Sequence, residues 1–125
     1  LITGALPDAK GIVIFEPDLE VGTEFLFMLR DSSKMMESAR KKCSDLMQRI
    51  EKDGRKPAFG FYIDCAGRTA RMSETIHEEA DIICEIFKQR DIPLLGFYSG
   101  VEVAPLLGKS RGLDWTGTLW VMTER

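Results

Sequence analysis

The segment IDCAGRTAR, residues 63–71, places a thiol, a glycine and a guanidinium between an apolar run and a helical pattern. The first N–H groups of a helix lack intrahelical partners and the helix dipole is positive there, so Gly67 would let an anion approach the backbone. Arg68 could add two parallel hydrogen bonds to a carboxylate. We therefore interpret this turn as a candidate anion cradle. A surface turn with a solvated arginine is the simpler alternative, because the segment has no GxGxxG or Walker pattern.

The same segment offers Cys65 as a nucleophile, because the helix dipole and Arg68 would both favour its thiolate. The alternative is a small buried residue at the end of a strand, since free cysteine is among the most buried residue types. The only histidine, His77, has acidic neighbours and no signature that places it beside Cys65. We therefore expect no catalysis, and without metal-ligand spacing we expect no metal and no cofactor. Cys43 and Cys84 lie on apolar helix stripes and are expected in the core.

A second candidate segment is SGVEVAP, residues 99–105. Gly100 inside an apolar run indicates a bulge or a close approach of two backbones. Glu102 is then a carboxylate among apolar neighbours near the level of a sheet. An exposed residue on an edge strand is an equally supported alternative.

Composition and charge indicate a globular domain and make nucleic-acid-binding and membrane-spanning classes of protein unexpected. The chain has 125 residues, of which 44% are hydrophobic and 30% charged, as expected for a single globular domain over residues 1–125. A net charge of -3 makes nucleic acid an unexpected partner. The odd set of three cysteines without CxxC spacing favours a reducing cytoplasm. No apolar run approaches the ~20 residues that span a bilayer, so no membrane contact is expected. The start at Leu1 suggests a fragment of a longer protein.

Hydrophobic periodicity predicts an α/β fold. Helices are expected at 33–52 and from Met72 to Phe87, where apolar residues recur every three or four positions. Strands are expected at 11–15, 24–30 and 58–64, and the closing strands are drawn from 94–99, 101–104 and 117–123. The predicted order is β-β-α-β-α-β-β. Because crossover connections are right-handed, both helices should cover one face of a mixed sheet, which gives a two-layer sandwich.

Period-two alternation divides the strand residues between two faces. The set expected to face the helices is Phe25, Phe27, Leu29, Phe59, Phe61, Ile63, Leu95, Phe97, Leu119 and Val121. The alternates are Leu26, Met28, Gly60, Tyr62, Gly96, Tyr98, Trp120 and Met122. This second set is too apolar for an ordinary solvated face, so we expect it to be covered.

Three segments together resemble the C-terminal half of the FIST domain family: CAGR at 65–68, GFYSGVEVAP at 96–105 and WTGTL at 115–119. The resemblance covers nearly the whole chain. It implies an intracellular sensory module of a signalling protein that binds small ligands such as amino acids. The expected ligand-binding residues are Cys65, Gly67, Arg68, Tyr98, Gly100 and Glu102, and Pro105 also matches the second motif. One departure is LDWT at 113–116, where family members tend to show a His-Asn-Gln-Thr-like stretch.

The leading hypothesis is therefore a non-catalytic sensory domain that binds an amino-acid-like or other small anionic ligand. Its expected partners are the N-terminal FIST half and the signalling effector domains of the same protein, with a homo-oligomer left open. The alternative is a protein-interaction or oligomerisation module whose aromatic sheet face docks a partner domain. An enzyme that uses Cys65 is the third hypothesis, and it lacks a recognisable general base.

Overall fold

The structure is a computed structural model, and it describes residues 2–14, 19–106 and 108–124. By its internal contacts the chain divides into two compact units, Leu1–Arg30 and Asp31–Arg125. In the first unit, β1 (Ile2–Leu6) and β2 (Gly11–Ile14) form an antiparallel hairpin. The strand predicted at 11–15 is thus present at 11–14, and its last residue lies outside the described residues. The single domain over 1–125 stays a prediction.

The strand predicted at 24–30 is wrong. Residues 19–30 form no strand in the described structure, and the side chains of Phe25 to Leu29 are exposed. Apolar, β-branched and aromatic composition favours a strand only where a neighbouring strand can pair with the backbone N–H and C=O groups. Within its own unit this segment pairs with neither β1 nor β2.

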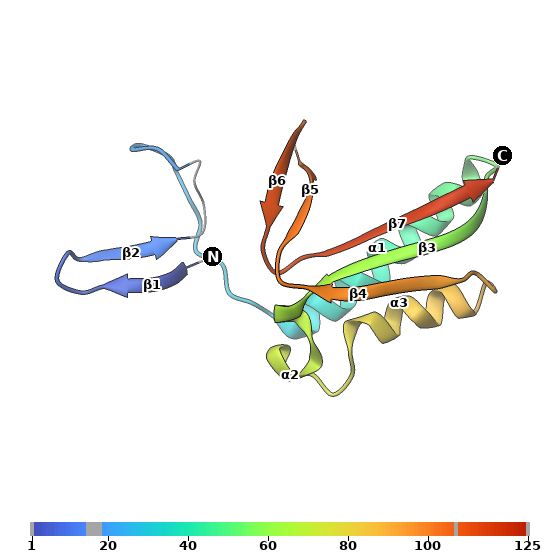
Figure 1. Ribbon diagram of the computed structural model, residues 1–125, viewed down its shortest axis with the longest axis horizontal. Coiled ribbons are helices and arrows are strands. Elements are labelled where there is room, and N and C mark those ends of the chain that lie inside the picture. Colours follow the sequence, from blue (N-terminus) through green and yellow to red (C-terminus); the bar gives the residue numbers. More distant parts are fainter. Residues whose placement is uncertain (1, 15–18, 107, 125) are drawn as a thin grey trace. The chain divides into compact units, whose positions relative to one another are not determined.

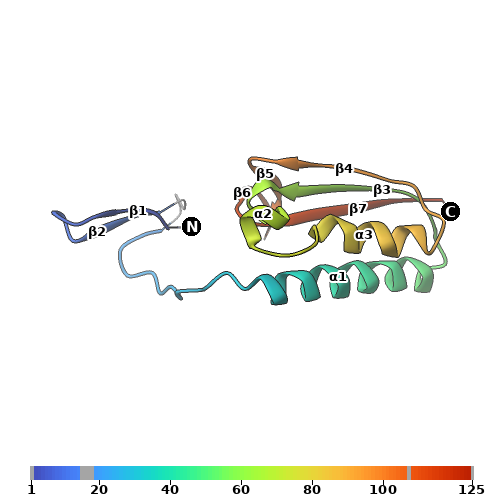
Figure 2. The same cartoon turned by 90° about the horizontal axis from the view of Figure 1, so that it is seen from below.

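The second unit contains the helices and the main sheet. Its elements are α1 (Ser32–Lys52), β3 (Lys56–Cys65), the single turn η1 (Ala66–Arg68), α2 (Ala70–Ser73), α3 (Glu79–Lys88), β4 (Leu94–Ser99), β5 (Glu102–Leu106), β6 (Lys109–Leu113) and β7 (Gly117–Glu124). The mixed sheet has the order β4-β3-β7, with β3 parallel to β4 and antiparallel to β7. Both long helices lie on one of its faces (Figures 1 and 2). The predicted two-layer α/β fold is confirmed.

Two details of the predicted strands change. The segment at 101–104 is not part of the main sheet, because β5 pairs with β6 in a separate antiparallel hairpin. Strand β6 was not expected, since KSRGL has neither the alternation nor the apolar content of a typical strand. This hairpin stands at one end of the sheet in Figure 1.

Helix α1 follows its prediction closely. Asp31 is the N-cap and accepts a hydrogen bond from the Lys34 N–H at 2.9 Å. The helix ends before Gly54, whose positive φ of 67° suits a residue without a Cβ. Its buried residues are Met35, Ala39, Cys43, Met47 and Ile50. The predicted apolar stripe is therefore the packing face of the helix.

The second predicted helix is interrupted. Glu74 has a left-handed φ of 54° and ends α2, and α3 begins after a capping box formed by Glu78 and Asp81. His77 lies exposed in the connection between them rather than in a helix. Cys84 is exposed, so its expected place in the core is wrong. The buried apolar residues of α3 are Ile82, Ile83, Ile86 and Phe87, whereas Met72 and Ile76 before it are exposed.

The phase of β3 and β4 is opposite to the prediction. Tyr62 is buried against the helices, and a Cβ on Gly60 would collide with the ring of Phe87 from α3. Gly60 therefore faces the helices because its missing side chain makes room for an aromatic ring. Strand β7 has the predicted phase, since Leu119 and Val121 pack against the core.

The side chains opposite the helices form what we call the open sheet face. Its members are Phe59, Phe61, Ile63, Leu95, Phe97, Thr118, Trp120 and Met122. Within the described part of this unit no helix or strand lies over that face (Figure 2). Among the described residues, no helix is both long and apolar enough to cross a lipid bilayer.

Candidate functional site

A buried ion pair between Arg68 and Glu79 lies near the end of β3. The turn η1 directs Arg68 toward the first residue of α3, where its Nε donates to Glu79 Oε2 at 2.7 Å and its Nη2 donates to Glu79 Oε1 at 2.6 Å. Its Nη1 donates to the Trp115 carbonyl at 2.8 Å. The side chains of Arg68 and Glu79 are only 12% and 2% exposed. Two parallel charged hydrogen bonds in such a buried place are among the stronger contacts of a protein interior.

Strand β3 adds two more groups to this ion pair. The Tyr62 hydroxyl donates to Glu79 Oε1 at 3.1 Å, and Asp64 Oδ1 lies 3.3 Å from Arg68 Nε. Asp64 Oδ1 also accepts the Cys65 N–H at 3.0 Å, whereas its Oδ2 has no hydrogen-bond partner among the described residues. One guanidinium therefore serves two buried carboxylates.

Burial is the main influence on the pKa values of the two strand residues in this group, Tyr62 and Asp64. Burial, and after it the charge of Glu79, raise the pKa of Asp64 to about 7, because the nearby Arg68 guanidinium opposes them only in part. Burial and the charge of Glu79 also raise the pKa of the Tyr62 hydroxyl, which stays a hydrogen-bond donor. Burial lowers the pKa of the Arg68 guanidinium, but its hydrogen bonds with Glu79 outweigh this and raise it overall.

The structure brings the three residues of the first predicted motif together. Cys65 is buried at the end of β3, and the Gly67 carbonyl accepts a hydrogen bond from Trp115 Nε1 at 3.0 Å. Arg68 stacks over the Trp115 ring, with its guanidinium carbon 5.3 Å from the ring centroid. The contacts of Arg68 are thus with groups of the protein itself. These contacts fix the turn against the loop before β7.

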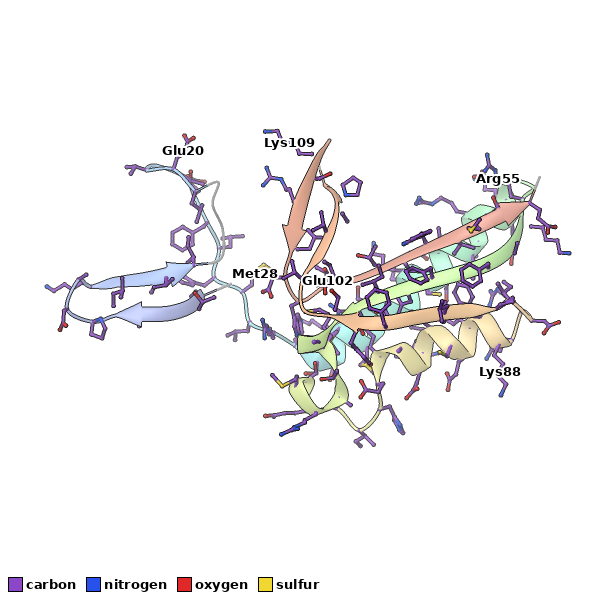
Figure 3. The ribbon with its side chains drawn as sticks, viewed as in Figure 1. Glu20, Met28, Arg55, Lys88, Glu102 and Lys109 are labelled. Atoms are coloured by element: carbon purple, nitrogen blue, oxygen red, sulfur yellow. The ribbon has the colours of Figure 1, made fainter. Side chains whose placement is uncertain are left out.

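Of the second predicted motif, Tyr98 lies beside that ion pair, since it is paired with Asp64 across β3 and β4. The Tyr98 hydroxyl donates to Glu78 Oε2 at 2.6 Å, and Gly100 lies in an exposed bend after β4. Glu102 is 2% exposed, and neither of its carboxylate oxygens has a hydrogen-bond partner in the described structure. Figure 3 places it at the base of the β5–β6 hairpin. The ion pairs of Arg68 within the described structure are with Asp64 and Glu79, and not with Glu102.

A cleft opens between α1 and β7 beside the buried ion pair. It encloses about 350 Å³ and is lined by Ser38, Ala39, Lys42, Cys43, Leu46, Tyr62, Arg68, Glu79, Ile83, Thr116, Gly117 and Leu119. Of the six predicted ligand residues, Arg68 alone is among these lining residues.

The polar groups that line the cleft differ in whether they already form a hydrogen bond or an ion pair within the protein. The buried Thr116 hydroxyl has no hydrogen-bond partner among the described residues. Lys42 is exposed and forms no ion pair with another described residue. Burial raises the pKa of the Cys43 thiol to about 11, so this thiol is neutral near pH 7. Among its lining groups, the Lys42 ammonium and the Thr116 hydroxyl are thus candidates for contact with an incoming molecule.

Sequence reasoning missed several polar residues of the site, among them Lys42 on α1. Glu79 belongs to the acidic run 78–81, which is typical of a solvated helix face, yet it is buried. Asp64 was placed only at the end of a strand, and Thr116 was noted only as part of the WTGTL segment and of the LDWT departure from the family pattern. A usable signal was the tripeptide GFY, which occurs in both β3 and β4. Its two tyrosines donate to Glu79 and Glu78, the consecutive acids at the start of α3.

Across the described residues, no group of three or more histidine, cysteine or acidic side chains could hold a metal ion.

Comparison with protein-family models matches residues 1–105 to the FIST C domain. Neither a curated protein nor a solved structure gives a match. The match extends over most of the chain and confirms the resemblance carried by CAGR and GFYSGVEVAP.

Proposed function

Because the chain belongs to the FIST C domain family, which is a family of sensory domains in signal transduction, we propose that it binds a small ligand in the cleft between α1 and β7. The ligand is amino-acid-like or another small anion, and it is bound without chemical change. In this proposal the domain works in the cytoplasm with the N-terminal FIST half and the effector domains of the same protein.

One observation carries this proposal. Thr116, whose buried hydroxyl has no hydrogen-bond partner among the described residues, lines a cleft of about 350 Å³ together with Lys42, which forms no ion pair with another described residue. Small-molecule sites enclose roughly 300–1,000 Å³ and combine apolar walls with a few polar groups. A buried polar atom without a hydrogen bond costs about 1–3 kcal/mol, and a ligand that bonds to it would relieve that cost.

The walls of the cleft suggest how such a ligand lies. Its carboxylate would meet the Lys42 ammonium and the Thr116 hydroxyl, since both can donate hydrogen bonds. Its apolar part would contact Leu46, Ile83 and Leu119. Arg68 then acts as a positioning residue, because its donors are held by Glu79 and the Trp115 carbonyl.

Thr116→Val is the sharpest test. Valine has nearly the same shape and removes only a hydroxyl that has no partner in the described structure, so the free energy of unfolding should stay equal or rise. Binding should nevertheless weaken about tenfold, because the ligand loses one hydrogen bond. Titration calorimetry with L-leucine, L-glutamate and acetate measures the affinity, and urea denaturation measures the stability.

Lys42→Ala provides the second arm, with Lys41→Ala as its matched control. Lys41 is the next residue on α1, is exposed, and pairs with Asp45 rather than lining the cleft. We expect a loss of about tenfold or more for Lys42→Ala and an unchanged Kd for Lys41→Ala. Equal affinity in Thr116→Val, Lys42→Ala and the unmodified chain would refute binding in this cleft.

A further inference from the structure

The open sheet face has the composition of a protein interior. Within its three stretches, 59–63, 95–97 and 118–122, the side chains of this face include no ionisable group. Phe61 on the central strand packs edge-on against Phe97, with 5.8 Å between ring centroids, and lies 5.1 Å from the ring of Trp120. Figure 3 shows aromatic side chains standing on this face of the sheet. Rings from all three strands thus form one continuous apolar layer.

This layer is unusually exposed for so apolar a surface. The exposed fractions of Leu95, Phe97, Trp120 and Met122 are 59%, 54%, 51% and 58%. A large apolar side chain has roughly 150–250 Å² of surface to bury, so these four residues alone expose on the order of 400 Å². With the half-buried members of the face, the patch reaches about 500 Å². Contiguous patches of that size commonly mark interaction sites on soluble proteins.

We propose that the open sheet face is a symmetric dimer interface, occupied by the same face of a second copy of this chain. A two-fold interface joins one patch to itself, so it needs no complementary charge or pocket on a different molecule. An apolar face without ionisable groups meets that condition, whereas it offers little to select a foreign partner by charge. The inference is independent of the ligand cleft, which lies on the opposite, helix-covered face of the sheet.

The geometry and the area are sufficient for such a dimer. Two sheets pack face to face at a separation of about 10 Å when their facing side chains are apolar and interdigitate. Two copies together would bury about 1,000 Å², which is at the lower limit of specific interfaces. The dimer should therefore be weak, with a Kd on the order of 10 µM.

Analytical ultracentrifugation of the 125-residue chain from about 1 to 500 µM tests the proposal, a range chosen to bracket that Kd. The unmodified chain should change from monomer to dimer with concentration. Trp120→Glu and, separately, Leu95→Lys should raise the Kd at least about a hundredfold, because each places like charges opposite one another in a symmetric interface. Both residues are at least half exposed, and circular dichroism checks that each variant is folded.

Ile76→Glu is the matched control. Ile76 is 92% exposed in the connection between α2 and α3 and does not belong to the open sheet face. This variant removes a comparable exposed apolar side chain, so its dimerisation should match that of the unmodified chain. A monomer at every concentration would overturn the proposal. A dimer that persists in both Trp120→Glu and Leu95→Lys would overturn it as well, because another surface would then hold the copies together.

Discussion

Asp64→Asn should make the folded protein more stable at alkaline pH. The Asp64 pKa is raised from 3.8 to about 7 by burial and by the nearby charge of Glu79. Between these two values the folded chain keeps a proton that the unfolded chain releases. The stabilisation from this group is therefore complete below about pH 4 and is lost as the pH rises through about 7. Asparagine cannot lose a proton, so the variant should lack this decline.

The magnitude follows from the size of the shift. A difference of about three pH units corresponds to about 4 kcal/mol, and relaxation of the site on ionisation brings the expected value to about 2–4 kcal/mol. Asparagine keeps a side-chain oxygen that can accept the Cys65 N–H, which Asp64 accepts at 3.0 Å. The variant should consequently resemble the protonated wild type in structure. Its advantage over wild type should appear only as the pH increases.

Urea denaturation at several values between about pH 4 and pH 8.5 measures this directly, because it brackets the window in which the two states bind different numbers of protons. Asp53→Asn, at the exposed end of α1, is the control and should follow wild type. A difference between Asp64→Asn and wild type that stays constant with pH would refute the reasoning. So would a folded-state carboxyl titration near 4, observed by NMR at Asp64.

Two further predictions concern packing and thiol exposure. Gly60→Ala should lower the free energy of unfolding by about 1–3 kcal/mol in urea denaturation, because its Cβ would enter the ring of Phe87. The control Gly112→Ala in β6 places its Cβ in open space and should change the free energy of unfolding little. Equal denaturation midpoints for the two variants would contradict this packing. Cys84 should be the first thiol to react with Ellman's reagent, since the other two cysteines are buried. Mass spectrometry identifies the modified residue, and preferential labelling of Cys65 would count against the described burial.

The sequence predicted correctly those helices and strands for which a single local pattern of apolar residues is sufficient. Helix α1 and strands β3, β4 and β7 were predicted because their apolar periodicity or apolar runs match what the core requires. The strand at 24–30 failed because strand formation depends on a partner that composition cannot reveal. The break before α3 was missed because the reciprocal capping by Glu78 and Asp81 competes with an apolar spacing that continues through it.

The candidate site was harder to predict from local patterns, because its contacts join residues that are distant in the sequence. Arg68 was found because a cation at a strand–helix turn is a local signal, but its partners come from distant positions in the chain. Glu79 is eleven residues away and the Trp115 carbonyl is 47 residues away. The phase of β3 was predicted the wrong way round because Gly60 has no side chain to assign, and its face is shown by the ring of Phe87 and by the burial of Tyr62.

The positions of the two tryptophans give the molecule a pair of optical probes. Trp115 is hydrogen-bonded to the Gly67 carbonyl and lies beside the Arg68 cation, next to the cleft, while Trp120 stands on the open sheet face. These are the chain's only tryptophans. Their emission spectra therefore report on two different surfaces: a solvent-exposed indole emits at longer wavelength than one held in a polar contact inside the protein. Replacing Trp120 by phenylalanine would leave a fluorophore beside the cleft alone, and replacing Trp115 would leave one on the open sheet face alone, so the two variants would follow events on the two faces separately.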